Sequence, residues 1–313
     1  MGSSFSVAAG AIAPLMFFML LGFLLNQRAH FDSVAIANFN KLVFKIFLPA
    51  NMFAAIYFSD IKSILNPRMI AYAVGGILVI YGLAYFFVCR LVKENRERGA
   101  IIQIVYRSNY IILGVPLVAN IYGPDAVNMP LMLAAIIPPI YNVLAVFTLE
   151  KFRGGHMDWG HILKGILTNP MILGALVGGL ARLLPFSLPD FLIKSIKEIA
   201  VGTTPLALII LGISFNFKSA VENLRTLVCC ILGRLVLAPA VFVTGAILCG
   251  FRGMELATLM CVVITPCAVA SYTMAQQMDS DGQLAGNCVI FSTAISFVTM
   301  FFWILAVQSM GLL

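Results

Sequence analysis

Two apolar segments of the sequence, residues 98–122 and 254–278, carry a proline and polar side chains near their middle. The residues concerned are Asn109, Gly114 and Pro116 in the first segment, and Thr265, Pro266 and Ser271 in the second. A proline inside a helix removes a backbone donor and clashes with the carbonyl group one turn earlier, so we expect each helix to break there.

The N-terminus of a half-helix exposes N–H groups with partial positive charge, and two such ends close together would bind a carboxylate. The paired breaks therefore predict a binding site for an organic anion. The alternative, two plain proline kinks relieved by neighbouring helices, stays open at this point.

Cationic side chains also fall within the apolar segments. Arg107 directly precedes the first break and is a candidate to shape an anion path, and Lys45 is a second candidate. Lys41 and Arg234 are interpreted as side chains that extend to the lipid headgroups, an interpretation that also stays open for Arg107. The 13 acidic residues fall in predicted loops or near segment ends. This distribution argues against a carboxylate proton relay inside the membrane.

The composition indicates the class of protein. Of the 313 residues, 61% are apolar and 11% are charged, and the mean hydropathy is +1.00. A soluble domain carries about 25% charged residues, so this chain lacks the polar side chains for a water-facing surface. Ten segments are long enough to cross a hydrocarbon core of about 30 Å, which predicts an all-α polytopic membrane protein. The predicted spans are residues 5–26, 34–58, 67–91, 98–122, 126–149, 160–184, 191–215, 224–249, 254–278 and 284–309.

The two halves of the chain show internal repetition. At an offset of 156 residues Pro49 falls on Pro205, and further prolines, glycines and basic residues coincide as well. Residues 1–156 and 157–313 are therefore predicted to be two five-helix repeats. Because five is an odd number, the second repeat is inverted relative to the first. The interrupted spans are the fourth of each repeat, which makes them helices 4 and 9.

The basic residues of the connecting loops indicate an orientation. With both termini outside, ten Lys and Arg residues fall in inside loops and six in outside loops. Loop lysines and arginines favour the inside, so the N-terminus and the C-terminus are predicted to lie outside the cytoplasmic (cell) membrane. These residues are dispersed and form no basic stripe, so nucleic acid is not expected as a partner.

The sequence lacks the common motifs of enzymes and metal sites. It contains no H-E-x-x-H and no G-x-S-x-G, and its histidines and cysteines show no metal-ligand spacing. The protein is therefore predicted not to be an enzyme and to hold no cofactor, while a coupling ion, H⁺ or Na⁺, stays open. A channel also stays open, although no filter-like loop or ring of like charges is visible.

Four stretches carry a family resemblance. They read NKLVFKIFLPANMF (residues 40–53), RSNYIILGVPLV (107–118), PLALIILGISFNF (205–217) and DGQLAGNCVIFSTAIS (281–296). In this order and spacing they resemble the auxin efflux carrier family, which includes plant auxin exporters and bacterial malate or malonate permease-like proteins. The resemblance implies ten helices in two inverted repeats, with broken helices 4 and 9 crossing around an organic anion.

The resemblance also implies which residues bind the anion. By this resemblance Asn109 and the Gly114–Pro116 turn would line one side, and Thr265–Pro266 the other. The interrupted segments themselves add Arg107, Tyr110 and Ser271 to the predicted binding residues. Lys45 departs from the family pattern, in which an aromatic or apolar residue is expected. A homodimer is implied by analogy.

These observations together predict a secondary carrier for a small carboxylate, such as a dicarboxylate or an auxin-like acid. It would work by alternating access at the crossing of helices 4 and 9. The alternative is a membrane sensor or receptor that binds an organic anion without moving it, although the short loops leave no room for a signalling domain. Neither the substrate nor the direction of transport follows from the sequence.

Overall fold

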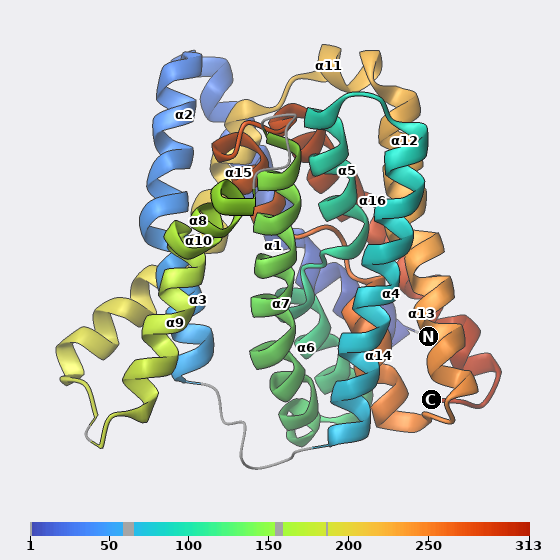
Figure 1. Cartoon of the computed structure of the whole chain (residues 1–313). Coiled ribbons are helices and arrows are strands. Elements are labelled where there is room, and N and C mark those ends of the chain that lie inside the picture. The colour runs from blue at the N-terminus through green and yellow to red at the C-terminus, as the bar shows by residue number, and fades with distance from the viewer. Residues whose placement is uncertain (1, 59–65, 154–158, 186) are drawn as a thin grey trace.

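The computed structural model describes residues 2–58, 66–153, 159–185 and 187–313, and the elements within these ranges are helices joined by short connections (Figure 1). The elements are α1 (Gly2–Ala29), α2 (Ser33–Leu42), η1 (Val43–Phe47), α3 (Leu48–Tyr57), α4 (Pro67–Leu91), α5 (Asn95–Tyr106), α6 (Tyr110–Tyr122), η2 (Pro124–Val127), α7 (Asn128–Arg153), α8 (Trp159–Thr168), α9 (Pro170–Leu183), α10 (Asp190–Ser214), α11 (Phe217–Glu222), α12 (Leu224–Leu232), η3 (Gly233–Leu237), α13 (Ala238–Leu248), α14 (Gly253–Ile264), α15 (Ala270–Gln277) and α16 (Gly282–Ser309). The predicted boundary between the repeats, at residues 156 and 157, lies outside the described residues.

Seven helical stretches in the described part of the chain are long and apolar enough to cross a membrane. They are Ile12–Ala29, Ser33–Tyr57, Pro67–Leu91, Asn128–Arg153, Asp190–Ser214, Leu224–Leu248 and Gly282–Ser309. The other three predicted spans each contain two shorter helices, namely α5 with α6, α8 with α9, and α14 with α15. The prediction of an all-helical, polytopic membrane protein is confirmed.

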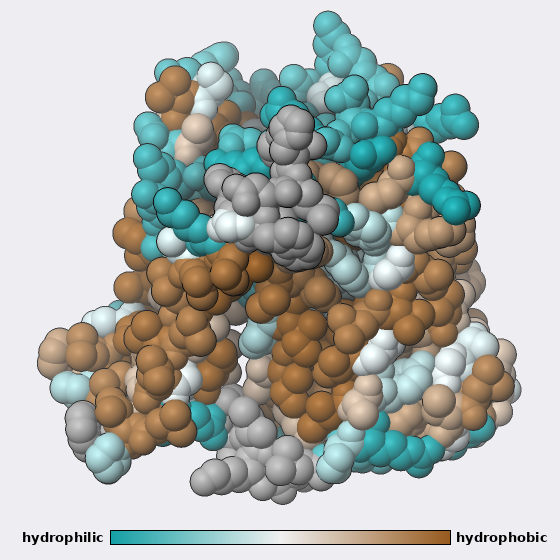
Figure 2. Space-filling view, in the orientation of Figure 1, coloured by the Kyte–Doolittle hydropathy of each residue, from teal (hydrophilic) through white to brown (hydrophobic). Residues whose placement is uncertain are grey.

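The outer surface agrees with a lipid environment. Figure 2 shows apolar residues in a broad band across the molecule, with hydrophilic residues gathered above it. Large apolar side chains such as Leu78, Val79 and Phe87 of α4 and Leu180 of α9 are exposed on this surface. An exposed apolar area of this extent is typical of a surface that contacts lipid.

Two spans contain a π-helical segment directly before a proline. These segments are η1, which precedes Pro49, and η3, which precedes Pro239. A proline has no N–H to donate to the carbonyl one turn earlier, and a π segment accommodates the lost bond by widening the helix. The Leu235 carbonyl, one turn before Pro239, accepts instead from the Trp303 indole at 3.0 Å. Pro205, the expected counterpart of Pro49, lies within an uninterrupted α10.

Glycines allow α9 to pack directly on the backbone of α3. A Cβ atom added to Gly174 would clash with the Pro49 carbonyl, and one added to Gly178 would lie 2.8 Å from the Phe53 carbonyl oxygen. Gly22 and Gly212 permit the same close approach between α1 and α10. The glycine pair of span 6, Gly174 and Gly178, therefore serves helix packing, as small-xxx-small motifs do in membranes.

Gly174→Ala is expected to lower the thermal unfolding midpoint of the purified protein. The added methyl group meets backbone atoms of α3 that cannot rotate away, and overpacking of this kind costs about 1–3 kcal/mol. Gly179→Ala on the same helix is the matched control, because the nearest atom to its Cβ is 4.0 Å away. Equal midpoints for the two variants would contradict the close α3–α9 contact.

Candidate substrate site at the helix crossing

The two broken helices pair through their interruptions. The first break joins α5 to α6 at residues 107–109, and the second joins α14 to α15 at residues 265–269. Ser108 and Cys267 form an antiparallel bridge. The Asn109 N–H donates to the Pro266 carbonyl at 2.8 Å, and the Ala268 N–H donates to the Arg107 carbonyl at 3.3 Å. These bonds provide partners for backbone groups that hydrocarbon would leave unsatisfied.

The crossing places four helix ends around one point. Figure 1 shows α5 and α15 in the upper half of the molecule and α6 and α14 in the lower half, with both breaks at mid-height. The N-termini of α6 and α15 therefore meet at the crossing, as do the C-termini of α5 and α14. The first N–H groups of α6, those of Tyr110 to Ile112, have no acceptor within their own helix and can bind an anion. At the start of α15 the Ser271 and Tyr272 N–H groups donate to the Ala268 and Val269 carbonyls, so this end contributes mainly its partial positive charge.

The first break lies at a different place from the one expected. Gly114 and Pro116 lie inside the continuous helix α6, and the interruption precedes them at Arg107–Asn109. Gly114 instead makes room for a neighbour, because a Cβ atom there would lie 2.6 Å from the Tyr110 ring and 3.2 Å from the Cys261 Cβ. The second break falls at Pro266, as predicted. The repeat offset, which aligns Asn109–Tyr110 with Thr265–Pro266, was the better guide to the first break.

A cavity of about 120 Å³ opens beside the crossing. One wall consists of the two breaks and the N-terminal residues of α6 and α15, and the other walls come from α3, α7, α9 and α10. Its polar lining residues are Asn51, Arg107, Ser108, Asn109, Tyr110, Tyr141, Asn142, Thr203 and Thr204. Among the described residues, no carboxylic acid lines the cavity. The cavity therefore offers hydrogen-bond donors and positive charge to a ligand.

Arg107 supplies the charge of this lining. Its side chain is 4% exposed, and its guanidinium donates to the Asn142 side-chain oxygen and to the Met274 sulfur. Both acceptors are neutral, and no described acidic residue forms an ion pair with Arg107. A buried charge without an ionic partner is costly, and a bound anion would compensate it.

The helix α7 fixes the crossing from the side. The Tyr141 hydroxyl lies 3.2 Å from the Ser108 hydroxyl, and the Tyr141 carbonyl accepts from the Tyr106 hydroxyl at 3.1 Å. The Asn142 side chain reaches both Arg107 and, through its amide, the Met52 sulfur on α3. One helix thus holds both the first break and the side chain that carries its charge.

The predicted site residues occupy three kinds of position. Arg107, Asn109 and Tyr110 line the cavity. Thr265 and Pro266 build the crossing but do not line the cavity, whose second break contributes Ala268, Val269 and Ala270. Ser271 is buried beside Gln103, which donates to its carbonyl at 3.1 Å, and Gly114 and Pro116 lie farther along α6. Lys45 is exposed and outside the cavity lining.

Several residues at the crossing were not predicted from the sequence. Asn51, Asn142, Thr203 and Thr204 reach the cavity from helices without a break. Arg234, interpreted from the sequence as a headgroup-directed side chain, is completely buried and bonds the carbonyls of the crossing, so that interpretation was wrong. Its depth within span 224–249 was a signal, because an arginine so far from either end cannot easily reach the headgroups.

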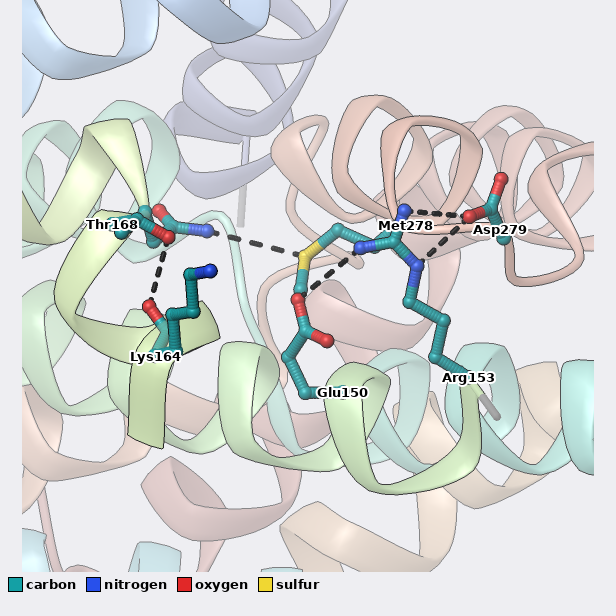
Figure 3. A network of polar contacts seen from close by, with 7 residues as sticks. Glu150, Arg153, Lys164, Thr168, Met278 and Asp279 are labelled. Carbon is teal, nitrogen blue, oxygen red and sulfur yellow. Dashed lines mark hydrogen bonds and ion pairs between the residues drawn. The ribbon is translucent and has the colours of Figure 1, made fainter. Parts of the chain in front are cut away.

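A second polar network lies away from the cavity, at one end of α7 (Figure 3). The Arg153 guanidinium pairs with the Asp279 carboxylate at 2.6 Å and with Glu150 at 3.4 Å. The Arg153 and Asp279 side chains are 37% and 66% exposed, so this pair contributes less than about 1 kcal/mol. The network links α7 to the turn after α15 and is a structural contact at the surface.

Comparison with known proteins identifies the family. The model of the family described as "Membrane transport protein" matches residues 7–158 and 159–304. The chain therefore belongs to this family of transporters, to which the auxin efflux carriers belong, and the resemblance seen in the sequence is confirmed.

The chain is also similar to three curated proteins described as uncharacterized transporters. It is 22% identical to one from Methanothermobacter thermautotrophicus over 93% of this chain and 96% of the relative. It is 22% identical to one from Methanocaldococcus jannaschii over 84% and 87%, respectively. It is also 22% identical to YfdV from Escherichia coli K12 over 86% and 88%. The similarity extends over nearly the full length of each relative.

Proposed function

We propose that this transporter is a secondary carrier for a small organic anion, a carboxylate such as a dicarboxylate or an auxin-like acid. The observation that carries this proposal is Arg107, a buried cation without an acidic partner among the described residues, in the lining of the crossing cavity. The transport family supports movement of the ligand across the membrane, and the lining supports its chemical class.

A charge estimate supports an anion with one or two negative charges. Each helix N-terminus contributes a partial charge of about +0.5. The N-termini of α6 and α15 together with Arg107 therefore give about +2 at the cavity wall. The described lining residues include no carboxylate, so a cationic substrate would meet uncompensated repulsion, and a neutral substrate would leave the arginine charge unpaired.

Alternating access is supported by the two sides of the cavity. The breaks and α7 form one side, while α3, α9 and α10 form the other. Close glycine contacts join α3 to α9 and α1 to α10, which makes the second side a firmly packed unit. We infer that the crossing shifts against this unit and exposes the cavity to either side of the membrane in turn.

The same proposal includes the arrangement of the helices in the membrane. Ten crossings in two inverted repeats, residues 1–156 and 157–313, would place both termini outside the cytoplasmic membrane. The antiparallel pairing of the two breaks, each in the fourth span of its half, supports such a pseudosymmetry. Accessibility labelling of single cysteines in the loops tests it, and a terminus labelled only from the cytoplasm would contradict it.

Uptake of labelled mono- and dicarboxylates into proteoliposomes tests the function. A carrier is expected to load vesicles faster than empty liposomes do, and unlabelled carboxylate on the inside should accelerate exchange. Binding of a carboxylate without any uptake would support the alternative of a membrane sensor. Uptake and binding that are both absent for all carboxylates would contradict the anion site.

Asn109→Ala is expected to weaken carboxylate binding by about tenfold, the value of one good hydrogen bond. The Asn109 side-chain amide lines the cavity, and its nitrogen is buried without an acceptor, so a ligand oxygen would satisfy it. Asn120→Ala is the control, because Asn120 lies on the same helix with an exposed side chain. Equal affinities for both variants, measured by equilibrium binding, would place the ligand elsewhere.

A further inference from the structure

Arg234 is the largest fully buried side chain in the described part of the chain, with 0% exposure. Its guanidinium donates five hydrogen bonds to backbone carbonyls at the crossing. Nε and Nη2 donate to the Thr265 oxygen at 3.1 and 2.7 Å, and Nη2 also donates to the Val263 oxygen at 2.9 Å. Nη1 donates to the Val105 and Tyr106 oxygens at 3.1 and 3.4 Å.

These four carbonyls belong to the C-terminal ends of α5 and α14. The last carbonyls of a helix have no partner within it, and each helix end carries a partial charge of about −0.5. Two such ends therefore give about −1, which one guanidinium balances in sign and size. In carriers with broken helices, unwound carbonyls and half-helix C-termini of this kind are the groups that coordinate Na⁺.

We propose that Arg234 is a resident cation, a positioning residue that holds the C-terminal ends of α5 and α14 in the place where a carrier can otherwise bind a sodium ion. Among the described residues no carboxylate pairs with Arg234, so its charge is available to the helix ends. The consequence for coupling rests on the proposed function: an anion carrier with this built-in cation completes its cycle without Na⁺.

The chain positions Arg234 through the π segment η3. Gly233 lets this segment approach α5, because a Cβ atom there would lie 3.3 Å from a Val105 methyl group. Pro239 follows and has no N–H to donate to the Leu235 carbonyl. The Trp303 indole on α16 donates to this carbonyl instead and so fixes the widened turn against α16. These contacts fix the position of Arg234 between the C-terminal ends of α5 and α14.

Arg107 and Arg234 then have separate tasks. Arg107 lines the cavity beside the N-termini of α6 and α15, whereas Arg234 is not among the described lining residues and donates its hydrogen bonds to the C-terminal ends of α5 and α14. Because Arg234 already neutralises the partial negative charge of the two C-terminal helix ends, this negative charge does not offset the positive charge of Arg107. The surplus positive charge of the crossing therefore faces the cavity.

The test compares the full-length wild type, Arg234→Gln, Arg234→Lys and the exposed control Arg225→Gln in detergent. Thermal unfolding is followed in NaCl and in choline chloride of equal ionic strength, and binding of radioactive sodium ion is measured in parallel. Wild type, Arg234→Lys and Arg225→Gln should give the same midpoint in both salts and bind no sodium. Arg234→Gln should lose about 5 °C or more in choline, regain part of it in NaCl, and bind sodium.

Other outcomes would overturn the proposal. The first is a wild type whose unfolding midpoint rises in NaCl. The second is an Arg234→Gln variant whose midpoint is equally low in both salts, and the third is an Arg234→Gln variant whose midpoint equals that of wild type. If Arg234→Gln yields no folded protein in either salt, Arg234→Lys decides, since it must still fold and ignore sodium. These readouts involve no transported anion, so their failure leaves the carrier proposal standing, and a failed uptake assay leaves them valid.

Discussion

Arg107→Gln is expected to weaken carboxylate binding by about 10- to 100-fold and to lower uptake at low substrate in proportion. Hydrogen bonds to charged groups contribute about 1.5–3 kcal/mol, and each 1.4 kcal/mol is a factor of ten in affinity. Glutamine retains polar atoms but removes the only positive side chain that lines the cavity in the described part of the chain. Equilibrium binding and initial uptake rates in proteoliposomes measure the effect.

Stability separates this effect from misfolding. Arg107 is a buried charge without an ionic partner among the described residues, so its removal should leave the unfolding midpoint unchanged or raise it. The carboxylate affinity of Arg107→Lys should fall between those of wild type and Arg107→Gln, because an ammonium keeps the charge but lacks the planar donor pair. Arg225→Gln, at an exposed position, should behave as wild type. Unchanged affinity in Arg107→Gln would remove this residue from the site.

Pro266→Ala is expected to lower the rate of transport at least tenfold while the protein stays folded, because the second break is then no longer fixed at this residue. Thr265 is extended, at φ −72° and ψ 153°, the conformation that a following proline imposes. Alanine lifts this restriction and restores an N–H, so α14 can continue past residue 265 and pull the Pro266 carbonyl away from the Asn109 N–H.

Pro116→Ala is the matched control for Pro266→Ala. Pro116 lies inside the continuous helix α6, where alanine restores a helical hydrogen bond, so transport should be retained and the unfolding midpoint should not fall. The assay is the initial uptake rate at saturating carboxylate, together with the unfolding midpoint. If Pro116→Ala abolished transport and Pro266→Ala preserved it, the functional break would lie at Gly114–Pro116 after all.

The sequence predicted the class, the family and the region of the crossing because each depends on strong local signals. Long apolar runs have few structural alternatives, and the proline in the second apolar segment coincides with the break at Pro266. Pro116 misled because a proline also fits inside a membrane helix when its neighbours satisfy the freed carbonyl. The break at Arg107–Asn109 is defined by pairing with the second break, and the repeat offset was its one trace in the sequence, because long-range backbone contacts leave no local pattern.

The two buried arginines, Arg107 and Arg234, show which features of the site could not be predicted from the sequence. Hydropathy alone cannot show whether a cation in an apolar span faces headgroups or carbonyls, since both environments satisfy a guanidinium. Arg234 required the C-terminal ends of α5 and α14, which approach each other only in the folded protein. Lys45, by contrast, remains exposed. Thr203 and Asn142 reach the cavity only because α10 and α7 pack beside the crossing.

The most direct test of the anion site is a comparison of three ligands of one shape: a dicarboxylate, its monoamide and its diamide. Equilibrium binding to the purified wild type should weaken in that order, because the cavity wall carries about two positive charges. In Arg107→Gln the difference in affinity between dicarboxylate and monoamide, and between monoamide and diamide, should be smaller. A diamide that binds wild type as tightly as the dicarboxylate would contradict the account, because the crossing would then recognise shape and not charge.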